Sequence, residues 1–335
     1  MTNPVIDVVG IGNAIVDVIA NADEAFLIRQ GLDKGAMRLI DEATAERLYG
    51  EMGAGLECSG GSAANSMVAL ASLGGRSAYI GKVKDDVLGR VFAHDIRASG
   101  VTYDSRFAAD GAATARCLIL VTPDAQRTMN TFLGASTDFG PADLDTALIG
   151  KASVTYLEGY LWDKPAAKEA FRQALRHAHG QGSKVALSLS DAFCVDRHRA
   201  EFLALVEEDV DILFANEAEI RSLYQVDEFD KALQLVRGHC EIAALTRSEK
   251  GSVVVSGAEI HVVDAAPVAR VVDTTGAGDF YAAGFLYGLT HGFDLARCAR
   301  LGALAAAEVI GHFGARPGTP LKPLVDASAK PLPRR

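Results

Sequence analysis

The sequence predicts an α/β domain with a doubly wound, mostly parallel sheet and a small β-rich lid. The first observation is that apolar, strand-like segments alternate with helical segments from about residue 141 onward, as is typical of a parallel sheet covered by helices on both faces. The second is that two stretches, at about 13–57 and 101–135, interrupt this rhythm with β-rich segments and glycine or polar breaks. We expect these stretches to form a lid inserted in one domain over residues 1–320, followed by a tail over 321–335.

Each element has a local signal in the sequence. Strands are short apolar runs, and helices end at glycines, as at Gly74 and Gly100. A β-hairpin pattern lies at 251–265, and the stretch from Pro317 holds five of the ten prolines, which predicts a loose tail. In chain order, strands are expected at 5–12, 77–83, 153–160, 184–190, 210–216 and 241–247, and helices at 60–73, 85–99, 165–180, 196–208, 217–239, 276–291 and 294–312.

The composition excludes several classes of protein. Lys and Arg number 33 against 43 Asp and Glu, a formal net charge of −10, so a general nucleic-acid binder is not expected. The five cysteines are scattered and form no C-x-x-C pair, which argues against a disulfide scaffold or a zinc module and fits a reducing compartment. The sequence shows no basic and apolar leader and no run of about 18 apolar residues, so we expect a cytoplasmic protein with no membrane partner.

Three glycine clusters are candidates for binding a phosphate or a cofactor. The first, around Gly10 and Gly12, follows a strand but lacks the third glycine of a dinucleotide fingerprint, and no P-loop motif occurs in the sequence. The second pairs Gly60 with Gly61 at a helix start, where first-turn amides and the side chain of Asn65 can donate to a ligand oxygen. The same residues are equally consistent with a plain helix start packed by small side chains.

The third cluster, at 273–279, is the most specific. Gly276, Ala277 and Gly278 lie between a Val-rich strand and a small-residue helix, where their backbone N–H groups and the positive end of the helix dipole would stabilise a transferring phosphoryl group. Asp279 follows at a position where a carboxylate can accept a proton from an attacking hydroxyl group. The alternative is a capped helix in which Asp279 satisfies first-turn amides.

These motifs resemble those of one known family, the PfkB or ribokinase-like carbohydrate and nucleoside kinases. The segment 273–286 is similar to the family's C-terminal signature, and the glycine pair with Asn65 is similar to its N-terminal signature. The segment 216–219 is similar to its N-x-x-E motif, and the three motifs have the family's order and spacing over roughly residues 5–320. The resemblance implies a ribokinase-like fold and transfer of the γ-phosphoryl group of ATP to a primary hydroxyl group.

The resemblance also implies roles for residues that bind the nucleotide. Asn216 and Glu219 would act mainly through water bound to Mg²⁺, which bridges the phosphates in such chemistry. Thr246 and Gly251 match the position of the family's nucleotide loop, although the residues between them depart from its common form. Arg127, in the presumed lid, would move onto the γ-phosphate, or it is an ordinary exposed arginine.

Within the family the sequence most resembles adenosine kinases. Its opening at 12–17 is similar to theirs, which implies that Asp17 accepts hydrogen bonds from the ribose 2′- and 3′-hydroxyl groups, with Asn13 as its polar partner. Sugar kinases of the family keep the same Asp, so Asp17 does not choose between them. A monovalent cation is often bound near the anion hole, and Asp273 with the carbonyl of Thr275 are the ligands that the resemblance implies for K⁺.

The expected activity is phosphorylation of the 5′-hydroxyl group of a nucleoside by ATP, with adenosine to AMP as the first candidate. A PfkB sugar kinase acting on ribose, fructose or a related sugar is the alternative. A protein of another class, a non-catalytic sensor or scaffold that binds nucleotide, stays open, as does the choice between a monomer and a homodimer. Phe132, Phe193 and Met37 could line an apolar purine slot or could be core residues.

Overall fold

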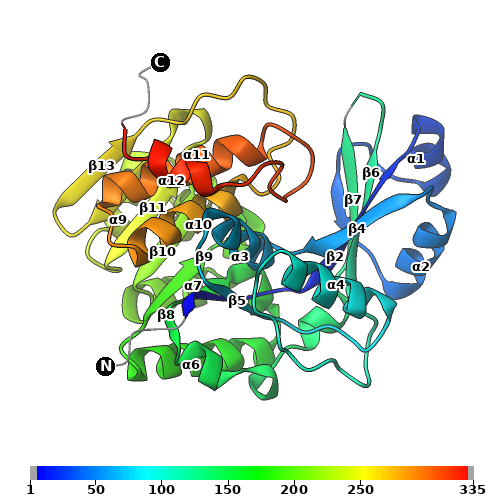
Figure 1. The fold of residues 1–335 in the computed structure, drawn as a ribbon, viewed down its shortest axis with the longest axis horizontal. Coiled ribbons are helices and arrows are strands. Elements are labelled where there is room, and N and C mark those ends of the chain that lie inside the picture. Colours follow the sequence, from blue (N-terminus) through cyan, green and yellow to red (C-terminus); the bar gives the residue numbers. More distant parts are fainter. Residues whose placement is uncertain (1–5, 125, 331–335) are drawn as a thin grey trace.

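A computed structural model describes residues 6–124 and 126–330. Its larger sheet has eight strands in the order β13-β12-β11-β10-β9-β8-β1-β5 (Figure 1). The six strands from β11 to β5 in this order are parallel, and a hairpin adds two antiparallel strands at one edge. The strands are β1 (Ile6–Ile11), β5 (Ser77–Ile80), β8 (Ala152–Glu158), β9 (Lys184–Ser188), β10 (Ile212–Asn216), β11 (Ile242–Thr246), β12 (Ser252–Ser256) and β13 (Glu259–Val263).

Helices cover both faces of this sheet, which confirms the predicted fold class. Alternate residues of the strands point to opposite faces, so Val8 packs in one hydrophobic cluster and Val9 in the other. The first face is covered by α3 (Ser62–Leu73), α4 (Val87–Ala98), α10 (Ala277–Thr290) and α11 (Leu295–Val309), and the second by α6 (Pro165–Gly180), α7 (Ala192–Glu208), α8 (Glu217–Tyr224) and α9 (Phe229–Val236), with α5 (Thr146–Ile149) beside α6.

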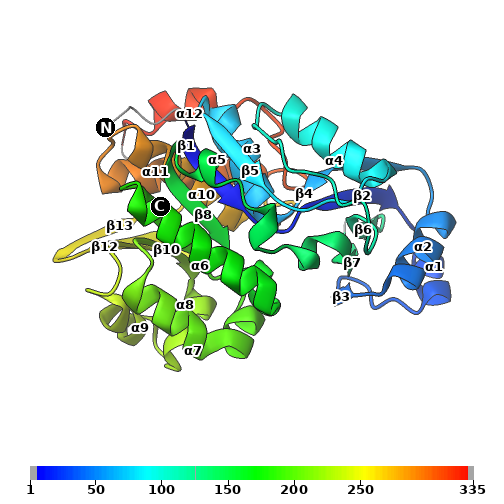
Figure 2. The ribbon, with the colours of Figure 1, turned by 90° about the horizontal axis from the view of Figure 1, so that it is seen from below.

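A second sheet of five strands, in the order β3-β7-β6-β2-β4, forms the lid. Its strands are β2 (Ile15–Asn21), β3 (Met37–Leu39), β4 (Gly55–Gly60), β6 (Ala115–Val121) and β7 (Arg127–Phe132). The chain passes from β1 into β2 after three residues, so the lid begins directly at the carboxyl end of β1, the strand next to the edge strand β5 of the large sheet. The helices α1 (Glu24–Gln30) and α2 (Glu42–Glu51) lie on the side of the lid away from the large sheet (Figure 2).

Two sequence predictions about the fold are wrong. The helix expected at 217–239 is two helices, because Gln225 adopts the left-handed region with φ of 51° and ends α8. The segment from 321 is not loose as far as residue 330: it forms α12 (Lys322–Ala327), Leu321 is buried, and the backbone carbonyl of Ser328 accepts a hydrogen bond from Arg300 of α11 at 3.0 Å. Residues 331–335 of the predicted tail lie outside the described residues. None of the described helices is both long and apolar enough to span a membrane.

Candidate active site

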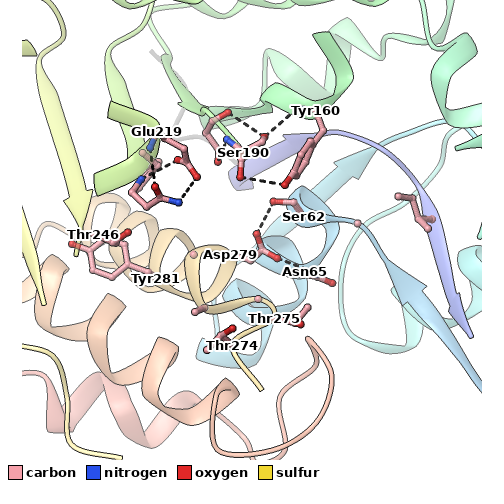
Figure 3. Close-up of a pocket in the computed structure, with 18 of the residues that line it drawn as sticks. Ser62, Asn65, Tyr160, Ser190, Glu219, Thr246, Thr274, Thr275, Asp279 and Tyr281 are labelled. Carbon is pink, nitrogen blue, oxygen red and sulfur yellow. Dashed lines mark hydrogen bonds between the residues drawn. The ribbon is translucent and has the colours of Figure 1, made fainter. Parts of the chain in front are cut away.

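A cleft lies between the carboxyl ends of the parallel strands and the inner face of the lid, where an open α/β sheet is expected to bind its ligands. Its cavity volume is about 360 Å³, and polar side chains of the large-sheet wall, among them Ser62, Asp279 and Glu219, gather around it (Figure 3). The predicted site residues that line it are Asp17, Gly61, Asn65, Asn216, Glu219, Thr246, Thr275, Gly276, Ala277, Gly278 and Asp279. The fold therefore gathers predicted residues of five separate segments around one cavity.

Asp279 lies at the first turn of α10, deep in the cleft. One carboxylate oxygen accepts a hydrogen bond from the hydroxyl group of Ser62 at 2.6 Å, and the other accepts one from the side-chain amide of Asn65 at 2.9 Å (Figure 3). Burial raises the pKa of Asp279 to about 6, against these two hydrogen bonds, which favour the charged form. A carboxylate with this pKa and one remaining lone pair on each oxygen is suited to accept a proton from a hydroxyl group near neutral pH.

The turn before α10 presents backbone amides to the cleft. Gly276 is the N-cap of α10 with φ of 80°, a left-handed conformation that favours glycine, and a Cβ added there would lie 2.9 Å from the Cβ of Ala315. The first N–H groups of a helix have no acceptor within the helix. The N–H of Ala277 donates to the carbonyl of Thr274, just before the helix, at 3.2 Å, so the N–H of Gly278, which lines the cleft, is the one left to bind an anion. A Cβ added to Gly278 would meet no atom within 4 Å, so open space lies beside this residue.

Arg127 of the lid reaches the loop that precedes this turn. Its guanidinium group forms an ion pair with Asp273 and donates to the hydroxyl group of Thr275 at 2.9 Å. Asp273 also accepts hydrogen bonds from the backbone of Thr275 and of Gly314, both at 3.0 Å, and these partners hold its pKa below the usual value in spite of burial. The Arg127 side chain is only 9% exposed, so its alternative interpretation as an ordinary exposed arginine is wrong.

The ion pair bears on the predicted K⁺ site. A monovalent cation at Asp273 would have to share or displace the guanidinium group of Arg127, because both oxygens of the carboxylate already have donors. The arrangement as folded therefore satisfies Asp273 without an added cation. K⁺ binding by Asp273 and the carbonyl of Thr275 stays a prediction.

Asp17 enters the cleft from the lid strand β2. Burial raises its pKa to about 6, although Arg316 and Arg127 lower it. Gly60 of β4 does not line the cleft, but a Cβ there would lie 2.5 Å from the carboxyl carbon of Asp17, so glycine is what lets this carboxylate take its position. Gly61 does line the cleft; its φ is 100°, and a Cβ there would lie 2.1 Å from the carbonyl oxygen of Asn13.

Asn13 is buried beneath the cleft and does not line it. Its side-chain amide donates to Glu158 at 2.8 Å, and the other oxygen of Glu158 accepts the backbone N–H of Ala63 at 2.8 Å. Glu158 thereby joins the start of the lid to the start of α3. The sequence motifs did not identify Glu158, although a lone carboxylate at the end of an apolar strand is a signal that could have done so. Burial raises the pKa of Glu158 to about 7.

The residues predicted to bind the nucleotide divide into two groups. Asn216 and Glu219 line the cleft and form a capping box for α8, in which the backbone N–H of each residue donates to the side chain of the other at 2.9 Å. Burial raises the pKa of Glu219 to about 7. Thr246 also lines the cleft, whereas Gly251 does not. Gly251 belongs to the tight turn before β12, which needs glycine because an added Cβ would lie 2.1 Å from the carbonyl oxygen of Val263.

The inner face of the lid carries two rows of side chains, of which only Asp17 and Met37 had been singled out from the sequence. The strand register places one polar row across neighbouring strands and, two residues further out, one apolar row. The polar row is Cys58, Asp17, Cys117 and Thr131, and the apolar row is Leu56, Ile19, Ile119, Met129 and Met37. Of these, Asp17, Cys117, Thr131, Ile119 and Met129 line the cleft. The three apolar candidates Phe132, Phe193 and Met37 do not.

This combination of fold and site defines a class of phosphotransferase, and comparison with known proteins gives the family. Residues 41–322 match the pfkB family of carbohydrate kinases, and the chain belongs to that family. The protein is therefore a kinase of the PfkB family, whose members generally use ATP and Mg²⁺.

Three similar proteins show the range of related activities. The crystal structure of adenosine kinase from Sinorhizobium meliloti is 52% identical, covers 96% of this chain and 99% of that one, and has a TM-score of 0.88. The structure of a probable sugar kinase from Rhizobium etli is 49% identical, covers 98% and 99%, and has a TM-score of 0.89. An uncharacterized sugar kinase from Archaeoglobus fulgidus is 30% identical over 75% of this chain and 98% of its own length.

Proposed function

We propose that this PfkB kinase transfers the γ-phosphoryl group of ATP to the 5′-hydroxyl group of a nucleoside, with adenosine as the substrate. The observation that carries the proposal is the pair of rows on the lid. Asp17 lies in the polar row next to Cys117 and lines the same cleft as Asp279. The neighbouring row presents Ile119 and Met129 to the cleft. A carboxylate for a vicinal diol beside an apolar wall matches the two parts of a nucleoside.

A free sugar fits this wall less well than a nucleoside does. Hydroxyl groups surround a pentose or hexose ring. Burying a hydroxyl group against an apolar wall without a hydrogen-bond partner costs free energy. A planar base instead gains from contact with apolar side chains. The similarity to an adenosine kinase from Sinorhizobium meliloti supports the same substrate. A sugar kinase remains the alternative, supported by the similarity to a probable sugar kinase from Rhizobium etli.

The residues of the chain have separate parts in the proposed reaction. Asp279 accepts the proton of the 5′-hydroxyl group as its oxygen attacks. The N–H group of Gly278, joined by that of Ala277 once a phosphate replaces its bond to Thr274, stabilises the charge on the transferring phosphoryl group. Arg127 lies close enough to this turn to add a positive charge when the phosphates displace it from Asp273. The lid forms one wall of the cleft, and we expect it to keep water away from the transferring phosphoryl group and so to limit hydrolysis.

Asn216 and Glu219 are the residues that would hold Mg²⁺. Both oxygens of Glu219 accept N–H groups of Asn216, so this pair is suited to contact the ion through water rather than directly. Among residues 6–124 and 126–330, no three His, Cys, Asp or Glu side chains gather as a metal site. When bound, Mg²⁺ neutralises phosphate charge.

A substrate panel tests the proposal. Rates with ATP would be measured for adenosine, 2′-deoxyadenosine, 3′-deoxyadenosine, inosine, ribose and fructose. We expect adenosine to have the highest kcat/KM, with a loss of about tenfold to a hundredfold for each deoxy analogue because Asp17 loses a partner. The Asp17→Asn variant should lower the rate with adenosine and reduce the penalty of the deoxy analogues. A kcat/KM for a sugar that exceeds that for adenosine would overturn the nucleoside assignment in favour of a sugar kinase.

A further inference from the structure

Arg316, which no motif identified, contacts the immediate environment of Asp279. It lies in the loop after α11, and its guanidinium group donates to the side-chain oxygen of Asn65 and to Ser59 of β4, whose hydroxyl group it reaches at 2.8 Å. Ser59 in turn donates its backbone N–H and its hydroxyl group to Asp95 of α4, at 2.7 and 2.5 Å. A continuous chain of contacts therefore runs from Asp95 through Arg316 and Asn65 to Asp279.

The contact with Arg316 determines how the amide of Asn65 is oriented. A guanidinium group has only donors, so it selects the carbonyl oxygen of the amide. The NH₂ group of Asn65 is then turned toward Asp279, where the carboxylate accepts it at 2.9 Å. The reversed amide would place two donors together at Arg316 and two acceptors together at Asp279. A single orientation is therefore strongly favoured.

The charge of Arg316 also acts on the carboxylates of the cleft. Arg316 lowers the pKa of both Asp279 and Asp17, against the larger effect of burial. The titratable and charged groups that face Asp279 are Asp17 on β2, Tyr156 and Glu158 on β8, Tyr160 after β8, Glu219 on α8 and Arg316. All of these except Arg316 are acidic groups, so none of them stabilises the ionised form of Asp279.

We propose that Arg316 is a positioning residue of the active site, which fixes the amide of Asn65 toward Asp279 and keeps that carboxylate ionised for proton transfer. The inference rests on the proposed role of Asp279 as the base. The backbone supports it as well, because the same loop donates the N–H of Gly314 to Asp273, before the turn that begins α10. The loop that contains Gly314 and Arg316 therefore contacts both Asp273, before the anion-binding turn, and Asn65, which donates to Asp279.

The test uses three variants of the full chain, with pH profiles of kcat/KM for the acceptor that the wild type uses best. In Arg316→Met the cation is lost, so the acidic limb of the profile should move up by about half a unit to one unit, and kcat should fall about tenfold or more. In Arg316→Lys the positive charge remains, but the guanidinium group that contacts Asn65 and Ser59 together is lost. We therefore expect kcat to fall while the acidic limb of the pH profile stays near its wild-type position. Arg300→Met is the matched control, because the Arg300 side chain donates to the backbone carbonyl of Ser328, directly after α12 and away from the cleft, and it should leave the profile unchanged.

A second readout separates the inference from the proposed activity. Carbon NMR of protein labelled at the aspartate carboxyl groups follows the titration of Asp279 directly, with Asp279→Asn used to assign the signal. If the wild type phosphorylates no acceptor of the panel, the proposed function fails, and this titration still decides the inference. Superimposable Asp279 titrations in the wild type and Arg316→Met would overturn it. Should Arg316→Met not fold, the Arg316→Gln variant takes its place with the same expected shift, and an unshifted titration there would equally overturn the proposal.

Discussion

Replacing Gly278 with alanine separates stability from phosphate binding. Gly278 is the second residue of α10 and lines the cleft, and an added Cβ would meet no atom within 4 Å. Alanine in a helix is favoured over glycine by about 0.5–1 kcal/mol. For a chain of 335 residues, this gain corresponds to a rise in Tm of about one degree. We therefore expect Gly278→Ala to be at least as stable as the wild type.

The same methyl group would stand beside the N–H groups that are proposed to bind the transferring phosphoryl group. Because misplacing a phosphoryl group by the length of one bond removes the alignment of these donors, we expect kcat to fall about a hundredfold. Steady-state kinetics with ATP measure this loss, and thermal unfolding measures Tm. The matched control is Gly180→Ala at the end of α6, where a Cβ also meets no atom within 4 Å; it should leave activity unchanged. Full activity of Gly278→Ala would refute phosphate binding at this turn.

Three further perturbations test other parts of the site. Gly61→Ala should lower the free energy of unfolding by more than about 2 kcal/mol, because its Cβ would overlap the carbonyl of Asn13. The control is Gly182→Ala, where φ is also positive but the added Cβ meets open space. Its free energy of unfolding, measured in the same urea titration, should fall by only about 1 kcal/mol. Since burial raises the pKa of Asp279 to about 6, and the base must be ionised, kcat/KM should rise with pH through about 6 and level off above 7; a flat profile between pH 5 and 8 would argue against this base. Glu219→Gln should raise the Mg²⁺ concentration for half-maximal rate about tenfold, measured by titration with MgCl₂, whereas an unchanged requirement would remove Glu219 from the metal site.

Local sequence patterns were sufficient to predict the fold class. The alternation of apolar strands and helices through 153–247 reflects burial on both faces of the sheet. This burial determines the pattern of apolar residues within each strand and helix, so it can be recognised from each segment alone. The break between α8 and α9 was missed because Gln225 has no sequence signal for its left-handed conformation. The segment from 321 was missed because prolines suggest a loose chain, whereas Pro323 occupies the first turn of α12, where proline is tolerated, and the docking of Leu321 depends on tertiary contacts.

The candidate site was predictable where its residues lie in one segment, and not where they come from distant ones. The turn 273–279 and the glycine pair at the start of α3 are local, so their spacing was informative. Glu158 meets Asn13 across 145 residues, and Arg316 meets Asn65 across 251 residues, and no local pattern predicts such contacts. The rows of the lid depend on strand register, which the order of strands in space determines.

The most direct test of the central claim is the Asp279→Asn variant, since proton transfer to this carboxylate beside the anion-binding turn is the step on which the proposed chemistry depends. Asparagine keeps the shape of the side chain and can still accept one hydrogen bond from Ser62 or Asn65, so the fold and adenosine binding should persist, as checked by thermal unfolding and calorimetry. Single-turnover phosphorylation of adenosine should slow by about a hundredfold to ten-thousandfold. A folded variant that phosphorylates adenosine at the wild-type rate would contradict the account.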